Sequence, residues 1–156
     1  MPSHPQLPSR TQPAPPPPWA KRLGYGGLLP FVGLALAAWA FDGPRQVQAI
    51  FALLAYGATI LSFLGAIHWG LAMRDACDPP VALLAWGVVP SLVAWLALLW
   101  GSNGGLLLLA ASLWTCWAVD HAIYPRFGLE GWLAMRLTLT AVASLFCVGA
   151  VLGALQ

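Results

Sequence analysis

Charged side chains are scarce in this sequence. Seven Lys or Arg and five Asp or Glu occur among 156 residues, so that 8% of the chain is charged, against about 25% in soluble globular domains. A water-soluble protein of this size could not cover its surface with so few charges. The formal net charge of +2 is also too small to indicate nucleic-acid binding, and we predict none.

Cysteines and catalytic motifs are scarce as well. The three cysteines, Cys77, Cys116 and Cys147, have no C-x-x-C spacing, so buried, unreactive thiols are the simplest interpretation. The chain has no GxSxG, HExxH or phosphate-binding loop sequence, and these are the patterns that carry hydrolytic, metal or nucleotide chemistry. We therefore predict that the protein is not an enzyme and has no resident metal or cofactor.

Long apolar runs dominate what remains. Residues 51–74 contain no charge before Arg74 and a single histidine, His68. At a rise of about 1.5 Å per residue, a helix of this length crosses the hydrocarbon layer of a bilayer. Polar turns rich in glycine and proline separate the other runs. The predicted fold class is all-α, a polytopic integral membrane protein with five transmembrane helices, over about 23–41, 47–73, 81–100, 106–123 and 131–155.

The amino-terminal residues 1–20 have a different composition. They are rich in proline and include four consecutive prolines, 15–18, which resist helix formation and favour an extended chain. We predict a disordered cytoplasmic tail over 1–20, followed by a transmembrane domain over 21–156. The first apolar run could instead be a cleaved secretory signal, but it is long for a signal core of about 7–15 residues and contains Pro30.

Basic residues indicate how the chain is threaded. In the five-span arrangement, Arg45 falls on one side of the membrane and six basic residues fall on the other: Arg10, Lys21, Arg22, Arg74, Arg126 and Arg136. Loops rich in Lys and Arg remain cytoplasmic. We therefore predict a protein of the inner (cytoplasmic) membrane with its amino terminus in the cytoplasm and its carboxyl terminus outside.

The few ionisable side chains within the predicted spans gather near the cytoplasmic surface. His68 lies about 9 Å inside the membrane boundary at helical rise. Asp120 and His121 end the fourth predicted span, and Arg136 lies near the start of the fifth. Polar groups in hydrocarbon are costly and commonly functional, so we predict that these four residues form a polar cluster in one leaflet.

Three interpretations of this cluster remain open from sequence. The simplest is structural: Arg136 neutralises Asp120, and His68 bonds to a backbone carbonyl, which fixes the helix register. The second is a ligand-binding or proton-coupled transport site, because histidine titrates near neutral pH and Asp120 could be its partner. The third is haem or metal binding through His68 and His121.

Two further features concern helix packing. Pro30 and Pro90 predict helix kinks, because each proline removes the bond to the carbonyl four residues earlier, at Gly26 and Trp86. One of these carbonyls is a candidate partner for His68. Small residues that would let another helix approach closely mark a packing surface on the second span: Gly57, Ala58, Ser62, Gly65, Ala66 and Gly70.

Four segments together resemble a known family: LGYGGLLPF at 23–31, YGATILSFLGAIHWGLA at 56–72, WGVVPSLVAWLALL at 86–99 and WLAMRLTLT at 132–140. They are similar to a bacterial and mitochondrial family defined by a domain of unknown function, whose animal members are called transmembrane protein 69. The resemblance covers about residues 23–150, and FLG-x-IHWG is its most specific part. It implies an inner-membrane protein of about five helices with no established activity, substrate or cofactor.

The family pattern carries over onto seven positions: Gly65, His68, Trp69, Gly70, Pro90, Asp120 and Arg136. In the family an arginine usually follows the aspartate, and a proline lies after the fifth-span arginine. This chain has His121 and Thr138 at those places, so the resemblance does not support His121 as a ligand. We predict a non-enzymatic scaffold or accessory factor that packs in the lipid bilayer against membrane-protein partners or as a homo-oligomer.

The threading can be tested with a reporter fused after Gln156. We expect an enzyme that is active only in the cytoplasm to be inactive there, and one active only outside the cytoplasm to be active. A fusion after Asp75, in a loop predicted to be cytoplasmic, is the control and should give the opposite pattern. Activity of the cytoplasmic reporter at Gln156 would contradict the predicted threading.

Overall fold

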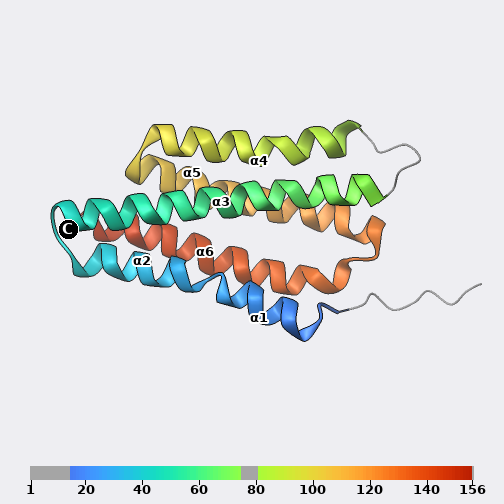
Figure 1. Ribbon diagram of the computed structural model, residues 1–156, viewed down its shortest axis with the longest axis horizontal. Helices are drawn as coiled ribbons and strands as arrows, with labels where there is room; N and C mark the ends of the chain where they lie inside the picture. Colours follow the sequence, from blue (N-terminus) through green and yellow to red (C-terminus); the bar gives the residue numbers. More distant parts are fainter. Residues whose placement is uncertain (1–14, 75–80, 156) are drawn as a thin grey trace, which may run out of the picture.

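The computed structural model describes residues 15–74 and 81–155, and all regular structure within these residues is helical (Figure 1). The elements are α1 (Pro18–Gly26), α2 (Leu29–Ala40), α3 (Pro44–Arg74), α4 (Val81–Trp100), α5 (Ser102–Ile123), the 3₁₀ turns η1 (Tyr124–Phe127) and η2 (Glu130–Trp132), and α6 (Leu133–Gly153). Five helical stretches are long and apolar enough to cross a membrane. The predicted all-α fold class and the five spans are confirmed.

The end of the predicted amino-terminal tail is helical in the structure. Residues 1–14 of the tail lie outside the described residues, as does the segment 75–80 with Cys77. Helix α1 begins at Pro18, within the predicted tail and five residues before the predicted start of the first span. Proline is tolerated in the first turn of a helix, where its missing N–H would have no helical partner.

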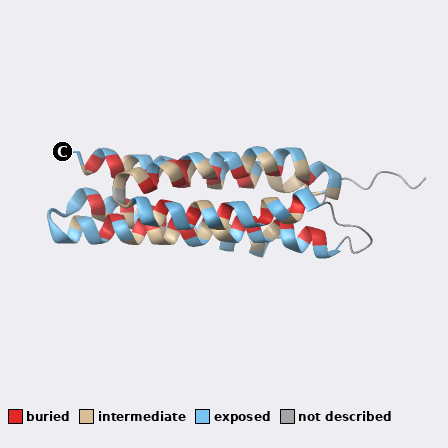
Figure 2. Ribbon diagram, turned by 90° about the horizontal axis from the view of Figure 1, so that it is seen from above, coloured by how far each residue is buried: buried red, intermediate tan, exposed pale blue. Residues whose placement is uncertain are grey.

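Helices α2, α3, α5 and α6 form a ring, and α4 packs on the outside of this ring (Figure 1). Helix α2 packs against α3 and α6, and α5 closes the ring through its own contacts with α3 and α6. Helix α4 packs against α3 and α5. Figure 2 shows the buried residues on the faces that the helices turn toward one another. Many large apolar side chains are exposed on the outer faces, as contact with lipid requires.

The first span consists of two helices. Helix α1 ends at Gly26 and α2 begins at Leu29, so the chain breaks upstream of Pro30, which lies in the first turn of α2. Gly27 and Leu28 between the two helices keep right-handed helical dihedral angles, so the predicted kink at Pro30 is a local interruption within one helical span. The hydroxyl of Tyr56 on α3 donates a hydrogen bond of 2.8 Å to the carbonyl of Gly27 in the break, which satisfies a backbone acceptor that the helices leave free.

Helix α3 is the central helix, because it packs against α2, α4 and α5. The predicted packing surface is only partly correct. Gly57, Ala58 and Gly65 are buried and Ser62 is half-buried, but Ala66 and Gly70 are exposed. Residues spaced four apart rotate about 40° per step around a helix of 3.6 residues per turn, so a stripe at that spacing leaves the interface after two steps.

Helices α3 and α4 approach each other closely where Gly65 of α3 meets Gly87 and Pro90 of α4. A Cβ atom at Gly65 would lie 2.5 Å from the carbonyl oxygen of Gly87 and 3.2 Å from the ring of Pro90. Helix α4 continues through Pro90 as one element, so the predicted kink there does not interrupt it. Two glycines and a proline thus let the backbones of α3 and α4 touch.

Gly65→Ala tests this contact. We expect it to lower the free energy of unfolding by about 1–3 kcal/mol, because the added methyl forces two backbones apart. Gly70→Ala is the matched control, since no atom lies within 4 Å of a Cβ at that position. Thermal unfolding of both purified variants in detergent measures the difference. Equal midpoints for the two variants would exclude a tight α3 and α4 contact at Gly65.

Candidate functional site

Three ionisable residues from three different spans meet inside the bundle. His68 lies on the buried face of α3, Asp120 lies in the last turn of α5, and Arg136 lies in the first turn of α6. The turns η1 and η2 reverse the chain between α5 and α6, which brings the last two residues together. The exposed fractions of His68, Asp120 and Arg136 are 1%, 1% and 7%. All three are therefore shielded from the surroundings of the protein.

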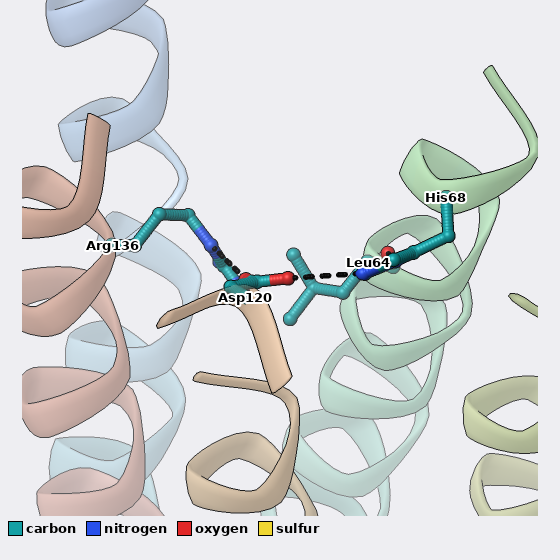
Figure 3. Close-up of polar contacts among 4 residues, drawn as sticks. All are labelled: Leu64, His68, Asp120 and Arg136. Atoms are coloured by element: carbon teal, nitrogen blue, oxygen red, sulfur yellow. Dashed lines mark hydrogen bonds and ion pairs between the residues drawn. The ribbon is translucent and has the colours of Figure 1, made fainter. Parts of the chain in front are cut away.

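Asp120 is the centre of this network (Figure 3). Its Oδ2 accepts a hydrogen bond of 2.8 Å from Arg136 Nε and lies 2.7 Å from Arg136 Nη2. Its Oδ1 lies 3.4 Å from His68 Nε2, on the other side of the carboxylate. One carboxylate therefore ties α5 both to α6 and to α3. An ionised carboxylate buried in this way requires such partners, because isolated buried charges are very costly.

The second nitrogen of His68 faces its own helix. Nδ1 lies 3.3 Å from the carbonyl oxygen of Leu64, whereas a carbonyl at Gly26 or Trp86 was predicted, so that part of the prediction was wrong. Both ring nitrogens of His68 thus face oxygen atoms. A neutral imidazole carries one N–H and can donate to only one of them, whereas an imidazolium can donate to both. In either neutral tautomer, the one N–H of the ring therefore faces an oxygen acceptor.

Two polar residues beside the network were missed from sequence. Tyr124 is 3% exposed and lines the same cleft as Arg136 and Thr140. Thr140 is 2% exposed, and its hydroxyl has no hydrogen-bond partner among the described residues. Each residue follows a network member by four positions, which places it on the same helical face. That spacing is the signal that could have revealed them.

The structure does not bring His121 to this network. His121 is exposed, and its ring stacks on Trp117 with 5.4 Å between centroids. Successive helical residues differ in direction by about 100°, so His121 faces away from the core that its neighbour Asp120 enters. Its inclusion in the predicted cluster was wrong. His68 is buried between helices, so the two histidines do not share a ligand position.

The comparisons with known proteins agree with this architecture. A family model described as "Protein of unknown function (DUF3429)" matches residues 16–152, which include the whole network. The chain belongs to the DUF3429 family. Transmembrane protein 69 of Xenopus tropicalis is 37% identical over 135 residues, which cover 83% of this chain and 52% of that protein. Transmembrane protein 69 of Mus musculus is 30% identical over 122 residues, which cover 75% of this chain and 49% of that protein.

These relatives confirm the resemblance inferred from the sequence motifs. This DUF3429 chain is a multi-pass membrane protein, and it spans about half the length of the curated relatives it matches. No solved structure matches it. The description of the family assigns no function.

A double-mutant cycle tests the Asp120 and Arg136 pair. We expect Asp120→Asn or Arg136→Met alone to lower the free energy of unfolding by about 3–5 kcal/mol, because each leaves an uncompensated buried group. The double variant should lose much less than the sum, since the two residues share one interaction. Arg126→Gln is the control, because Arg126 is exposed. Additive losses in chemical unfolding would show that the two side chains do not interact.

Proposed function

We propose that this protein is a non-enzymatic helical scaffold or accessory factor of the inner membrane that packs against partner membrane proteins. The observation that supports this proposal most is that the buried charged side chains contact one another within the bundle. Asp120 contacts Arg136 and His68 of two other spans, so its polar atoms hold helices together. Polar contacts of this kind fix the relative positions of membrane helices where apolar packing alone is permissive.

The outer faces of the spans suit the same role. Large apolar side chains are exposed on every span, among them Leu36, Phe63, Trp95, Leu107 and Leu145. Such faces contact lipid or apolar helices of a partner, and a homo-oligomer would use the same surfaces. A rigid interior with an apolar exterior is what a protein that positions other membrane proteins requires.

A proton-coupled transporter or ligand-binding membrane protein is the second candidate, and one specific observation favours it. His68 Nε2 lies 3.4 Å from Asp120 Oδ1, a longer contact than the 2.7 Å and 2.8 Å that Arg136 makes. This looser contact leaves Nε2 without a hydrogen-bond partner among the described residues, and a buried histidine beside a carboxylate within a membrane span is typical of proton-coupled or ligand-binding sites. The predicted haem or metal site gains no such support, because His68 and His121 lie apart.

Native purification of the full chain from its own membranes tests the scaffold proposal. We expect the wild-type protein to migrate as an assembly larger than the isolated chain, with the same partner recovered in fixed ratio. Asp120→Asn should lower both abundance and assembly several-fold, because a loss of about 1–2 kcal/mol already changes cellular abundance to that extent. Arg126→Gln, at an exposed position, should change neither.

The transporter alternative expects a different result. Asp120→Asn and His68→Ala would then accumulate and assemble like the wild type, and a pH-dependent flux measured in proteoliposomes would be lost. Normal abundance of both variants together with that loss would reject the scaffold proposal.

A further inference from the structure

A cleft of about 590 Å³ adjoins the polar network on the side of α1. Its walls come from α1, α2, α3 and α6, with Leu113 and Tyr124 contributed by the fourth span. Most lining residues are apolar, and those with polar side-chain atoms are Tyr124, Trp132, Arg136 and Thr140. The volume lies within the range of about 300–1,000 Å³ that small-molecule sites occupy.

The polar residues lie within the cleft and not at its end. The lining residues of η2 and α6 extend from Trp132 to Ala143, about 16 Å at helical rise, which is close to half the hydrocarbon thickness of a bilayer. Arg136 and Thr140 lie one and two turns along this path from Trp132. Thr140 lies about 12 Å along the cleft from Trp132 at helical rise. The head of a bilayer phospholipid stays at the water interface, so a phospholipid would place only methylene groups beside the Thr140 hydroxyl. The cleft therefore fits a ligand whose polar head enters the hydrocarbon region.

The hydroxyl of Thr140 indicates that this ligand bears hydrogen-bonding atoms. Several other hydroxyls in the described spans donate to a carbonyl three or four residues earlier in their own helix: those of Thr59, Ser62, Ser112, Thr115, Thr138 and Ser144. The Thr140 hydroxyl makes no such bond and has no other partner in the described chain, although it is buried. A buried polar group without a partner is costly, and a ligand in the cleft would remove that cost.

Charge indicates that the head of the ligand is neutral. Arg136 is already balanced by Asp120, so a carboxylate or phosphate head would leave a net negative charge in a medium of low dielectric constant. A guanidinium has five N–H groups, and only its Nε and Nη2 face Asp120, so it retains N–H groups that can bind another acceptor. An uncharged head with carbonyl oxygens meets both conditions.

We propose that the cleft binds an isoprenoid quinone. A quinone head is flat and uncharged, and its two carbonyl oxygens lie on opposite edges of the ring. Arg136 and Thr140 are donors one helical turn apart on one face of α6. Phe31, Phe63 and Trp132 supply aromatic surface along the cleft, where ring stacking is favourable. The isoprenoid tail occupies the remaining apolar part. The proposal concerns binding alone and includes no redox step.

Titration of the full chain in nanodiscs with decylubiquinone tests this proposal, with calorimetry as the measurement. We expect saturable binding of one quinone per chain. Thr140→Val removes the hydroxyl and keeps the shape, and it should weaken binding about 5- to 10-fold, the effect of one lost neutral hydrogen bond. Thr138→Val is the matched control, because Thr138 is exposed and bonds within its own helix, and it should bind like the wild type.

A second pair of variants fills space and does not depend on Thr140. Ile60→Trp adds bulk to a residue that lines the cleft and should abolish binding. Leu92→Trp adds the same side chain on the exposed face of α4 and should leave binding unchanged. The thermal midpoint of each variant without ligand shows whether it is folded.

Two competitors separate a quinone site from a general lipid groove. Methyl palmitate has an ester carbonyl but no ring, and palmitate has a charged head. We expect neither to displace decylubiquinone at equal concentration. Binding of methyl palmitate or palmitate as tightly as the quinone, or equal affinity of the Thr140→Val and Thr138→Val proteins for the quinone, would overturn the proposal.

Discussion

A carboxylate enclosed by membrane helices is the constraint on which this structure depends. Asp120 is 1% exposed, and an ionised carboxylate in that position must be neutralised and hydrogen-bonded. Arg136 supplies the charge, and His68 meets the second oxygen. The reversal of the chain through η1 and η2 brings Arg136 to this carboxylate, and the orientation of α3 turns His68 toward it. Buried ion pairs contribute little net stability, and their better-attested value is to fix one arrangement among several.

Aromatic donors fasten the other helices in a comparable way. Trp39 Nε1 on α2 donates to the carbonyl of Gly149 on α6, and Trp69 Nε1 on α3 donates to that of Leu84 on α4. The hydroxyl of Tyr56 on α3 binds the carbonyl at the break between α1 and α2. Such residues combine a large apolar body with one polar atom. In this protein that atom joins neighbouring spans through backbone acceptors.

The spans could be predicted from the sequence because the thickness of the hydrocarbon layer sets the minimum length of an apolar run that can cross it. It also placed Asp120 and Arg136 at a similar depth, because depth follows from position along a helix of known rise. Direction around the helix is harder to infer. His121 has nearly the depth of Asp120 but points elsewhere, and Ala66 and Gly70 rotate off the packing face. Depth therefore identified candidates, whereas the packing of neighbouring helices decided which of them meet.

The separation of sixteen residues between Asp120 and Arg136 has a consequence for biosynthesis. During synthesis α5 leaves the ribosome before α6, so its carboxylate reaches the translocon before its cation does. An aspartate at the centre of a membrane helix costs about 2.5–3.5 kcal/mol on insertion scales, and Asp120, in the last turn of α5, bears part of that cost. Helices α5 and α6 therefore integrate most favourably as a hairpin, with the carboxylate already neutralised when both enter the lipid. The ring of helices closes last, because α2 of the first span contacts α6 of the last span, which is synthesised after all the others.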